Sequence, residues 1–173
     1  DADAFFYTDS PPITNLIDRH KDKNFIFSYD MKVKWKWDFR AAINSGVFIA
    51  KNSNYTKEFL KEWGYSDEVR KKGKKLHYED QGGLRYMLGT NILNIEDEST
   101  IIPFGIFQEF YKKRLFLLDG CSHFEKGMKK VGMKFNSGKE YGLKNRPFIF
   151  HVANEPDAVR VEVAKHYLFT GQI

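Results

Sequence analysis

The stretch AAINSGVFIA at residues 41–50, followed by NYTKEFLKEW at residues 54–63, decides the fold of this chain. The first segment is apolar except at Asn44-Ser45-Gly46, which predicts a buried strand interrupted at those three residues. The second segment carries apolar residues at helical spacing, namely Tyr55, Phe59, Leu60 and Trp63. A buried strand followed at once by an amphipathic helix is typical of α/β proteins.

The same alternation extends in both directions along the chain. Further strands are predicted at residues 25–29, 92–95, 101–102 and 146–152, and further helices behind Ser10-Pro11-Pro12, at residues 77–88 and at residues 155–167. We therefore predict an α/β fold with a mixed, mainly parallel sheet flanked by helices, in a single domain over residues 1–173. In such sheets ligands gather at the carboxyl ends of the strands.

Composition limits the class of protein. The chain has 173 residues, of which 42% are hydrophobic and 16% aromatic, so it can bury a sizeable core and is not expected to be disordered. No apolar run approaches the roughly 20 residues that cross a bilayer. The single cysteine, Cys121, excludes an internal disulfide and mildly favours a reducing compartment.

The net charge of +5 indicates an anionic partner without choosing among nucleic acid, a nucleotide diphosphate and membrane headgroups. The basic residues cluster at 70–75, at 112–114 and at 126–139, and each cluster is predicted to be a loop. These loops are either solvated or form a positive rim that attracts phosphates. Lys144 and Arg146 are two further cations that could contact a phosphate, although a simple loop position is the commoner role.

Two carboxylates open the chain in Asp1-Ala2-Asp3, and His151 follows the apolar run Phe148-Ile149-Phe150. Alternate residues at the end of a strand point to the same side, so Asp1 and Asp3 can present two oxygen ligands to one cation. With His151 as a third ligand, such a site suits Mn2+ or Mg2+ carrying a diphosphate. A strand-end histidine that is merely satisfied by the backbone is the alternative for His151 alone.

Four motifs occur in a fixed order: Asp-x-Asp at residues 1–3, NSGVFIAKN at 44–52, EDQGGL at 79–84 and FHVAN at 150–154. In this order they resemble the catalytic half of retaining glycosyltransferases with the GT-A fold. The nearest relatives by this resemblance are the galactosyl, mannosyl and xylosyl transferases of glycosyltransferase family 34, and the glycogenin-like family 8 is more distant. The resemblance extends from Asp1 to about Asn154.

The resemblance implies roles for individual residues. Asp1, Asp3 and His151 would hold a divalent metal, Mn2+ or Mg2+, on the nucleotide diphosphate, while Asn44, Ser45 and Gly46 would contact the transferred sugar and the acceptor. Asp80 and Gln81 would hold the hydroxyls of the donor sugar and face its anomeric carbon. The alternatives are a strand bulge at residues 44–46 and a helix N-terminal acid beside a solvated amide at residues 80–81.

The resemblance also implies features that the sequence lacks. The family's histidine commonly precedes a glycine-containing turn, whereas here Val152-Ala153-Asn154 follows His151, so Asn154 would have to supply the left-handed turn near the phosphates. A nucleotide-binding region would precede the Asp-x-Asp motif, and none is present. The chain is therefore interpreted as a fragment or a truncated product that contains the catalytic portion.

The resemblance implies transfer of a hexose or pentose from a UDP- or GDP-sugar to a glycan or glycoprotein acceptor, with retention of configuration. The acceptor is the least determined part: Trp35 and Trp37 alternate along an expected strand, which suits stacking on sugar rings and core packing equally. An inactive carbohydrate-binding relative is the second hypothesis. A metal-dependent nuclease or phosphoesterase is a distant third, because no second cluster of ligands is evident, and no nucleic-acid partner is expected.

The compartment depends on the source. Golgi residence on the lumenal side would follow for a eukaryotic enzyme whose N-terminal anchor is lost, and a cytoplasmic location otherwise.

Overall fold

The computed structural model describes residues 4–6, 11–29, 43–76, 79–102, 107–110, 149–151 and 157–170. The chain divides into two compact units. One unit contains His20–Ile102, and the other contains Asp1–Arg19 together with Pro103–Ile173.

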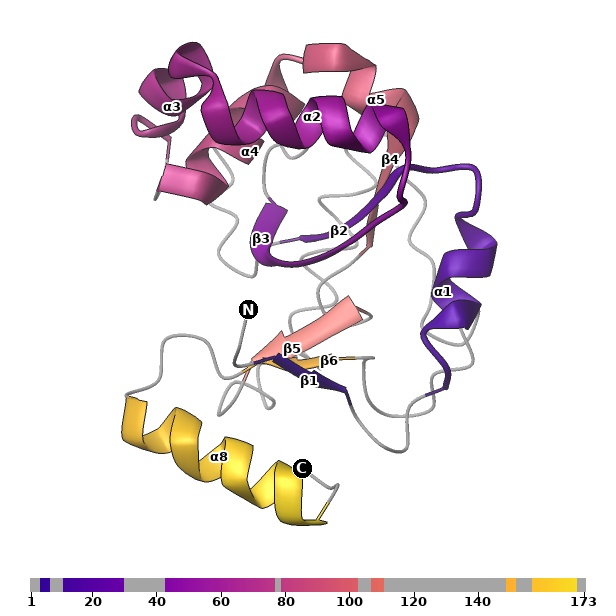
Figure 1. The fold of residues 1–173 in the computed structure, drawn as a ribbon, viewed down its shortest axis with the longest axis vertical. Helices are drawn as coiled ribbons and strands as arrows, with labels where there is room; N and C mark the ends of the chain where they lie inside the picture. The colour runs from indigo at the N-terminus through magenta and orange to yellow at the C-terminus, as the bar shows by residue number, and fades with distance from the viewer. Residues whose placement is uncertain are drawn as a thin grey trace, which may run out of the picture. The chain divides into compact units, whose positions relative to one another are not determined.

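A three-stranded sheet forms the base of the unit His20–Ile102 (Figure 1). Its central strand β2 (Phe25–Tyr29) pairs antiparallel with β3 (Ile43–Ala50) and parallel with β4 (Ser99–Ile102). All five residues of β2, the central strand, are buried. Strands were predicted at all three places, and these predictions are confirmed.

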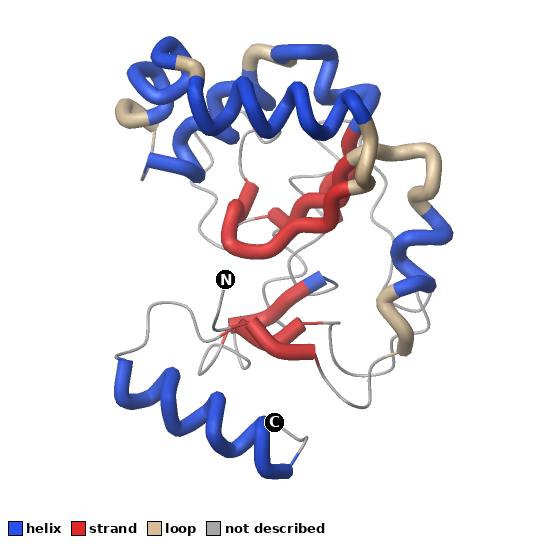
Figure 2. The backbone as a smooth tube through the Cα atoms, in the orientation of Figure 1, coloured by secondary structure: helices blue, strands red, loops and turns tan. Residues whose placement is uncertain are grey.

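Helices cover one face of this sheet (Figure 2). They are α2 (Asn54–Tyr65), α3 (Asp67–Gly73), α4 (Glu79–Gly89), the 3-10 turn η2 (Ile92–Asn94) and α5 (Ile95–Glu98). The predicted helices at residues 54–63 and 77–88 correspond to α2 and α4. The α/β class predicted from the sequence is confirmed.

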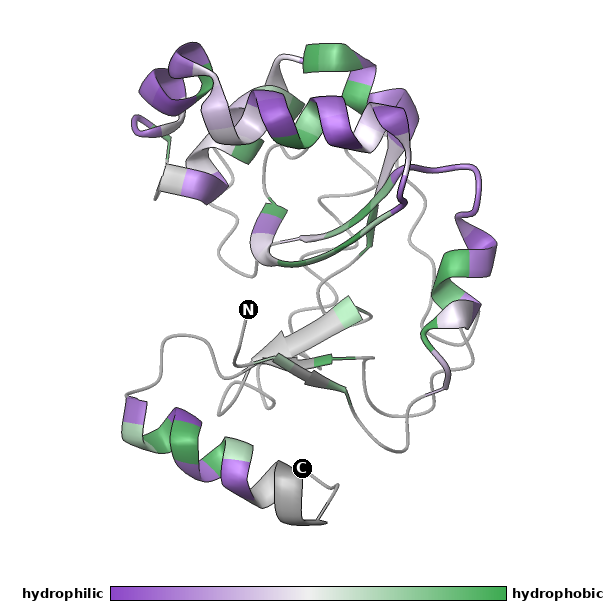
Figure 3. Cartoon of the chain, viewed as in Figure 1, coloured by the Kyte–Doolittle hydropathy of each residue, from purple (hydrophilic) through white to green (hydrophobic). Residues whose placement is uncertain are grey.

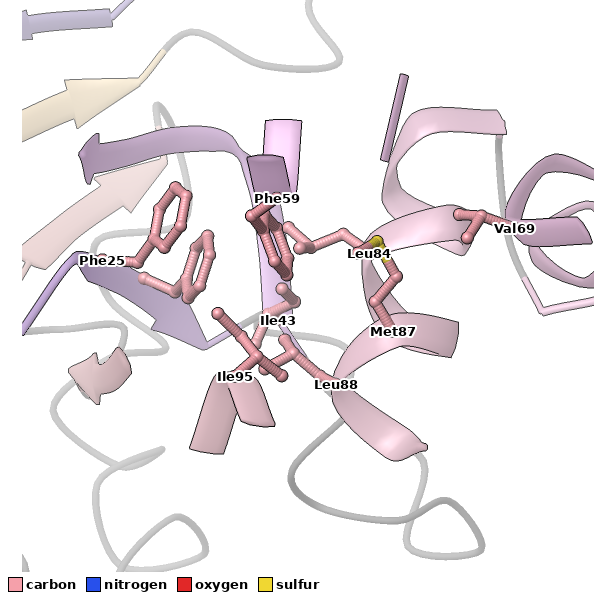
Figure 4. Close-up of a cluster of buried hydrophobic side chains, with 9 residues drawn as sticks. Phe25, Ile43, Phe59, Val69, Leu84, Met87, Leu88 and Ile95 are labelled. Atoms are coloured by element: carbon pink, nitrogen blue, oxygen red, sulfur yellow. The ribbon is translucent and has the colours of Figure 1, made fainter. Parts of the chain in front are cut away.

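A cluster of buried apolar side chains joins the helices to the sheet (Figure 4). Phe25 and Phe27 stack with ring centroids 5.2 Å apart, and Phe59 of α2 packs 4.9 Å from Phe25. Leu84 and Met87 of α4 complete the contact, and both are fully buried. Burial of each large apolar side chain contributes about 1.5–3 kcal/mol of transfer free energy, so this cluster holds α4 firmly against the sheet.

The second unit contains another three-stranded sheet. β1 (Ala4–Phe6) pairs antiparallel with β6 (Ile149–His151), and β6 pairs parallel with β5 (Gln108–Phe110). In each described sheet one pair is therefore parallel and the other antiparallel. The sheet is mixed, as predicted, while the expected excess of parallel pairs is not seen among the described strands.

Two helices of this unit agree with the sequence-based predictions. α1 (Thr14–Arg19) follows Pro11-Pro12 and buries Leu16, and α8 (Asp157–Thr170) begins just after Glu155-Pro156. Within the described part of the chain, none of the helices has the length and apolar character needed to cross a membrane.

The strand predicted at residues 92–95 was wrong. Asn91, Leu93 and Asn94 all have positive φ, and the chain forms η2 and the start of α5 there. The Asn91 Oδ1 accepts a hydrogen bond from the Glu96 N–H at 3.0 Å, which stabilises this tight reversal.

The basic run at residues 70–75 is not wholly a loop, since its first part lies in α3. Ser66 caps this helix, Asp67 and Glu68 occupy its first turn, and basic residues occupy its last turn. This distribution complements the helix dipole. The other two basic clusters, at 112–114 and 126–139, lie outside the described residues.

Tyr55 is expected to make the stability of the protein fall at alkaline pH. Its hydroxyl is buried and donates to no acceptor among the residues described, while its ring lies against Phe25 and Phe59. Burial, reinforced by the charges of Glu98 and Glu58, raises the pKa of Tyr55 to about 12. Between its ordinary value of 10.0 and about 12 only the unfolded chain loses this proton, so stability is retained below pH 10 and lost as the pH rises towards 12.

Urea unfolding at pH 9 and pH 11 measures this effect. Tyr55→Phe should reduce the loss of stability between the two pH values, whereas Tyr65→Phe, at a side chain that is 81% exposed, serves as the control. The same pH dependence in Tyr55→Phe and in the unmodified protein would show that another group is responsible.

Candidate functional site

A bulge in β3 shapes the first part of the candidate site. Phe27 pairs with Phe48, but the next residue, Ser28, pairs with Asn44, so Ser45, Gly46 and Val47 are extra residues on the β3 side. The Asn44 Oδ1 accepts a hydrogen bond from the Gly46 N–H at 2.9 Å and closes the turn. The interruption predicted at Asn44-Ser45-Gly46 is therefore present, and such bulges reorient side chains next to functional sites.

The bulge contacts the first turn of α4. The Ser45 hydroxyl donates a hydrogen bond to Asp80 Oδ2 at 2.8 Å, and the Trp63 indole N–H donates to the backbone carbonyl of Asp80, also at 2.8 Å. Ser45 is 9% exposed, whereas Asp80 is exposed and the neighbouring Gln81 is half-buried. Two of the four motifs, 35 residues apart in the sequence, thus meet at one hydrogen bond.

Arg85 holds the same two elements together and was not predicted from the sequence. It is 4% exposed, and its Nε and Nη2 both donate to the Ile43 carbonyl at 3.4 Å, just before the bulge. Arg85 lies one helical turn after Gln81, so both residues are on the same face of α4. The available signal was an arginine among the apolar residues of the segment LRYML, at a position where a buried charge needs a partner.

Two glycines allow α3 and α4 to approach closely, which fixes the start of α4. A Cβ atom on Gly73 would lie 2.4 Å from the Gly83 nitrogen and 2.7 Å from the Gly82 carbonyl carbon, both of which are backbone atoms. Gly82 and Gly83 follow Asp80-Gln81 directly in the EDQGGL motif. A Cβ atom on Gly83 would lie 3.2 Å from Val69 Cγ1 of α3 and 3.3 Å from the Trp63 ring, so this glycine has a packing role beside two candidate catalytic residues.

In the other unit, the pairing of β1 with β6 involves one predicted metal ligand, His151, and the residue next to another. Ala4, which follows Asp3 in the sequence, pairs with His151 across β1 and β6. Opposed residues of an antiparallel pair have Cα atoms about 4.5–5.5 Å apart. The register thus brings Ala4, the residue that follows the Asp-x-Asp motif in the sequence, opposite His151 of the FHVAN motif.

Several predicted site residues fall outside what the structure describes. They are Asp1, Asp3, Trp35, Trp37, Lys144, Arg146 and Asn154, together with the side chain of His151. Among the described residues there is no group of three His, Cys, Asp or Glu side chains that could hold a metal ion. The metal site therefore stays a prediction.

Comparison with known protein families matches residues 1–157 to the nucleotide-diphospho-sugar transferases. The chain belongs to this family. A comparison with curated proteins found no match. Nucleotide-diphospho-sugar transferases take their sugar from a nucleotide-sugar donor, and the matched region contains all four motifs, from Asp-x-Asp to FHVAN.

The family assignment relates the Ser45–Asp80 contact to the chemistry of sugar transfer. In this transferase the contact brings a hydroxyl and a carboxylate together where the sheet meets α4. A carboxylate can hold sugar hydroxyls and stabilise positive charge that develops at an anomeric carbon. The roles implied for Ser45, Asp80 and Gln81 by the order of the motifs stay predictions.

Proposed function

We propose that the protein is a retaining, metal-dependent glycosyltransferase that moves a hexose or pentose from a UDP- or GDP-sugar to a glycan or glycoprotein. The hydrogen bond between Ser45 and Asp80 is the main support, because it joins the two motifs expected to contact the transferred sugar. The order of the motifs supports a relation to glycosyltransferase family 34 as part of this proposal.

The chemistry follows from the leaving group. The acceptor oxygen forms a new bond to the anomeric carbon, the bond from that carbon to the diphosphate oxygen breaks, and the acceptor proton passes to the departing diphosphate. Asp80 and Gln81 stabilise the positive charge that develops on the sugar, and Ser45 orients the Asp80 carboxylate. No strong protein base is needed for this reaction.

The proposed metal ligands are Asp1, Asp3 and His151, with Lys144, Arg146 and Asn154 near the phosphates. Two carboxylates and an imidazole suit Mn2+ or Mg2+, which would supply Lewis-acid stabilisation of the nucleotide diphosphate. The pairing of Ala4 with His151 supports this set, because Ala4 directly follows Asp3 in the sequence.

Hydrolysis of a panel of nucleotide sugars by the protein tests the proposal. We expect free nucleotide diphosphate with Mn2+ and none with a chelator, and a loss of at least about a hundredfold in Asp3→Ala. Asp22→Ala, an exposed aspartate outside the motifs, is the matched control.

Other outcomes identify the alternatives. Sugar binding without turnover would indicate an inactive carbohydrate-binding relative. Cleavage of single-stranded oligonucleotides without hydrolysis of any donor would replace the transferase by a nuclease.

A further inference from the structure

A hollow of about 710 Å³ lies next to Asp80, between α2, α3 and α4. Leu60 and Trp63 of α2 line one side, while Arg70 and Lys71 of α3 and the capping residue Lys74 line another. Its volume is in the range of pockets that hold small ligands. Among the described residues, those that line it all belong to the unit His20–Ile102.

The apolar side of the hollow has a fixed indole. Trp63 is half-buried, its N–H donates to the Asp80 carbonyl at 2.8 Å, and its ring meets Phe48 edge-on with centroids 5.8 Å apart. These contacts hold the ring in one orientation, so little conformational entropy is lost when a ligand stacks on it. A flat aromatic ring of this kind suits the apolar face of a sugar.

The α3 side of the hollow is cationic. Arg70 forms an ion pair with Asp67, which also lines the hollow. Lys71 lies in α3, and Lys74, three residues later, is the residue that caps the C-terminal end of this helix. Figure 3 shows α3 as a largely hydrophilic helix. Asp80 lines the hollow as well. The hollow therefore has the carboxylate of Asp80, which is expected near the donor sugar, and the positively charged lysines in its wall.

We propose that this hollow is the acceptor subsite, and that it selects a sugar carrying an anionic group. The sugar ring would stack on Trp63, and its carboxylate or phosphate would contact Lys71 and Lys74. The acceptor hydroxyl would then be next to Asp80, the residue assigned to the donor sugar. The assignment of the hollow as an acceptor subsite rests on the proposed transferase function. The binding of an anionic sugar that it predicts can be measured without turnover.

The basic run itself supplies the matched variants. Lys71→Gln with Lys74→Gln removes two charges that line the hollow, and Lys72→Gln with Lys75→Gln removes two charges from the same run that do not line it. Calorimetry would measure binding of a galacturonic acid oligosaccharide, a neutral oligosaccharide of equal length, a hexose phosphate and a single-stranded oligonucleotide. Donor hydrolysis would be measured alongside.

We expect the acidic ligands to bind the unmodified protein more tightly than the neutral one. The Lys71/Lys74 variant should bind them about tenfold more weakly, and the Lys72/Lys75 variant within about twofold of the original value. The difference should shrink at high salt. Preference for the uronic acid or for the hexose phosphate would identify which anion is recognised.

Equal binding of acidic and neutral sugars, or an equal loss in both double variants, would overturn the proposal. So would tighter binding of the oligonucleotide with the same dependence on Lys71 and Lys74, which would point to nucleic acid. Absence of donor hydrolysis in the unmodified protein and in both double variants would instead contradict the transferase function. The difference in binding between acidic and neutral sugars would still test the subsite.

Discussion

Asp80→Asn is expected to lower nucleotide-sugar hydrolysis and sugar transfer by about a hundredfold to a thousandfold. The asparagine keeps the size of the side chain and an oxygen that can accept the Ser45 hydrogen bond, so the fold should be unchanged. It removes the negative charge that would stabilise the sugar as positive charge develops on it. The effect should therefore fall on kcat more than on KM.

Two further variants make this result specific. Ser45→Ala keeps the Asp80 charge and removes only the group that orients it, so a smaller loss of about tenfold is expected. Asp97→Asn makes the same change of charge at an exposed aspartate in α5 and should leave the rate unchanged. If Asp80→Asn keeps more than a tenth of the activity, Asp80 has no catalytic role.

Gly73→Ala should destabilise the protein by about 3 kcal/mol, at the upper end of the usual cost of overpacking. The new methyl group would meet backbone atoms at 2.4 Å and 2.7 Å, which cannot rotate away as a side chain could. α3 and α4 must then separate, and α4 carries Asp80. Activity is therefore expected to fall together with the melting temperature.

The chain offers a graded series for this measurement. A Cβ on Gly83 would meet side-chain atoms of Val69 and Trp63 at 3.2–3.3 Å, so Gly83→Ala should cost less than Gly73→Ala. A Cβ on Gly64 would have nothing within 4 Å, so Gly64→Ala should be neutral or stabilise by up to about 1 kcal/mol. Thermal unfolding that ranks the three variants differently would contradict the close approach of α3 and α4.

Much of the unit His20–Ile102 could be predicted from its sequence, because its strands and helices have regular apolar periods. Residues 25–29 are continuously apolar apart from Ser28, and α2 repeats an apolar residue every three or four positions. The bulge at Asn44-Ser45-Gly46 was also visible, since polar residues and glycine interrupt a buried run. The order of the four motifs along the whole chain indicated a sugar transferase, and residues 1–157 match the nucleotide-diphospho-sugar transferases.

The remaining features depend on contacts between residues that are distant in sequence. Arg85 stabilises the bulge only because β3 and α4 are adjacent in space, and no local pattern reveals that. The segment ILNI at residues 92–95 has the composition of a strand, but Asn91 and Asn94 adopt left-handed conformations that end extended structure. The lysine-rich sequence of α3 has no apolar period, so it was predicted to be a loop. This short helix is stabilised by its cap and by its charges.

The bulge in β3 has a further consequence for how this protein can change. Without Ser45, Gly46 and Val47, the pairs Phe27–Phe48 and Ser28–Asn44 would be consecutive, and β2 and β3 would form an uninterrupted antiparallel ladder. A shorter sequence could therefore make the more regular hairpin, at the loss of the hydroxyl that reaches Asp80. Any related sequence that depends on the Ser45 hydroxyl must therefore keep the interruption in β3.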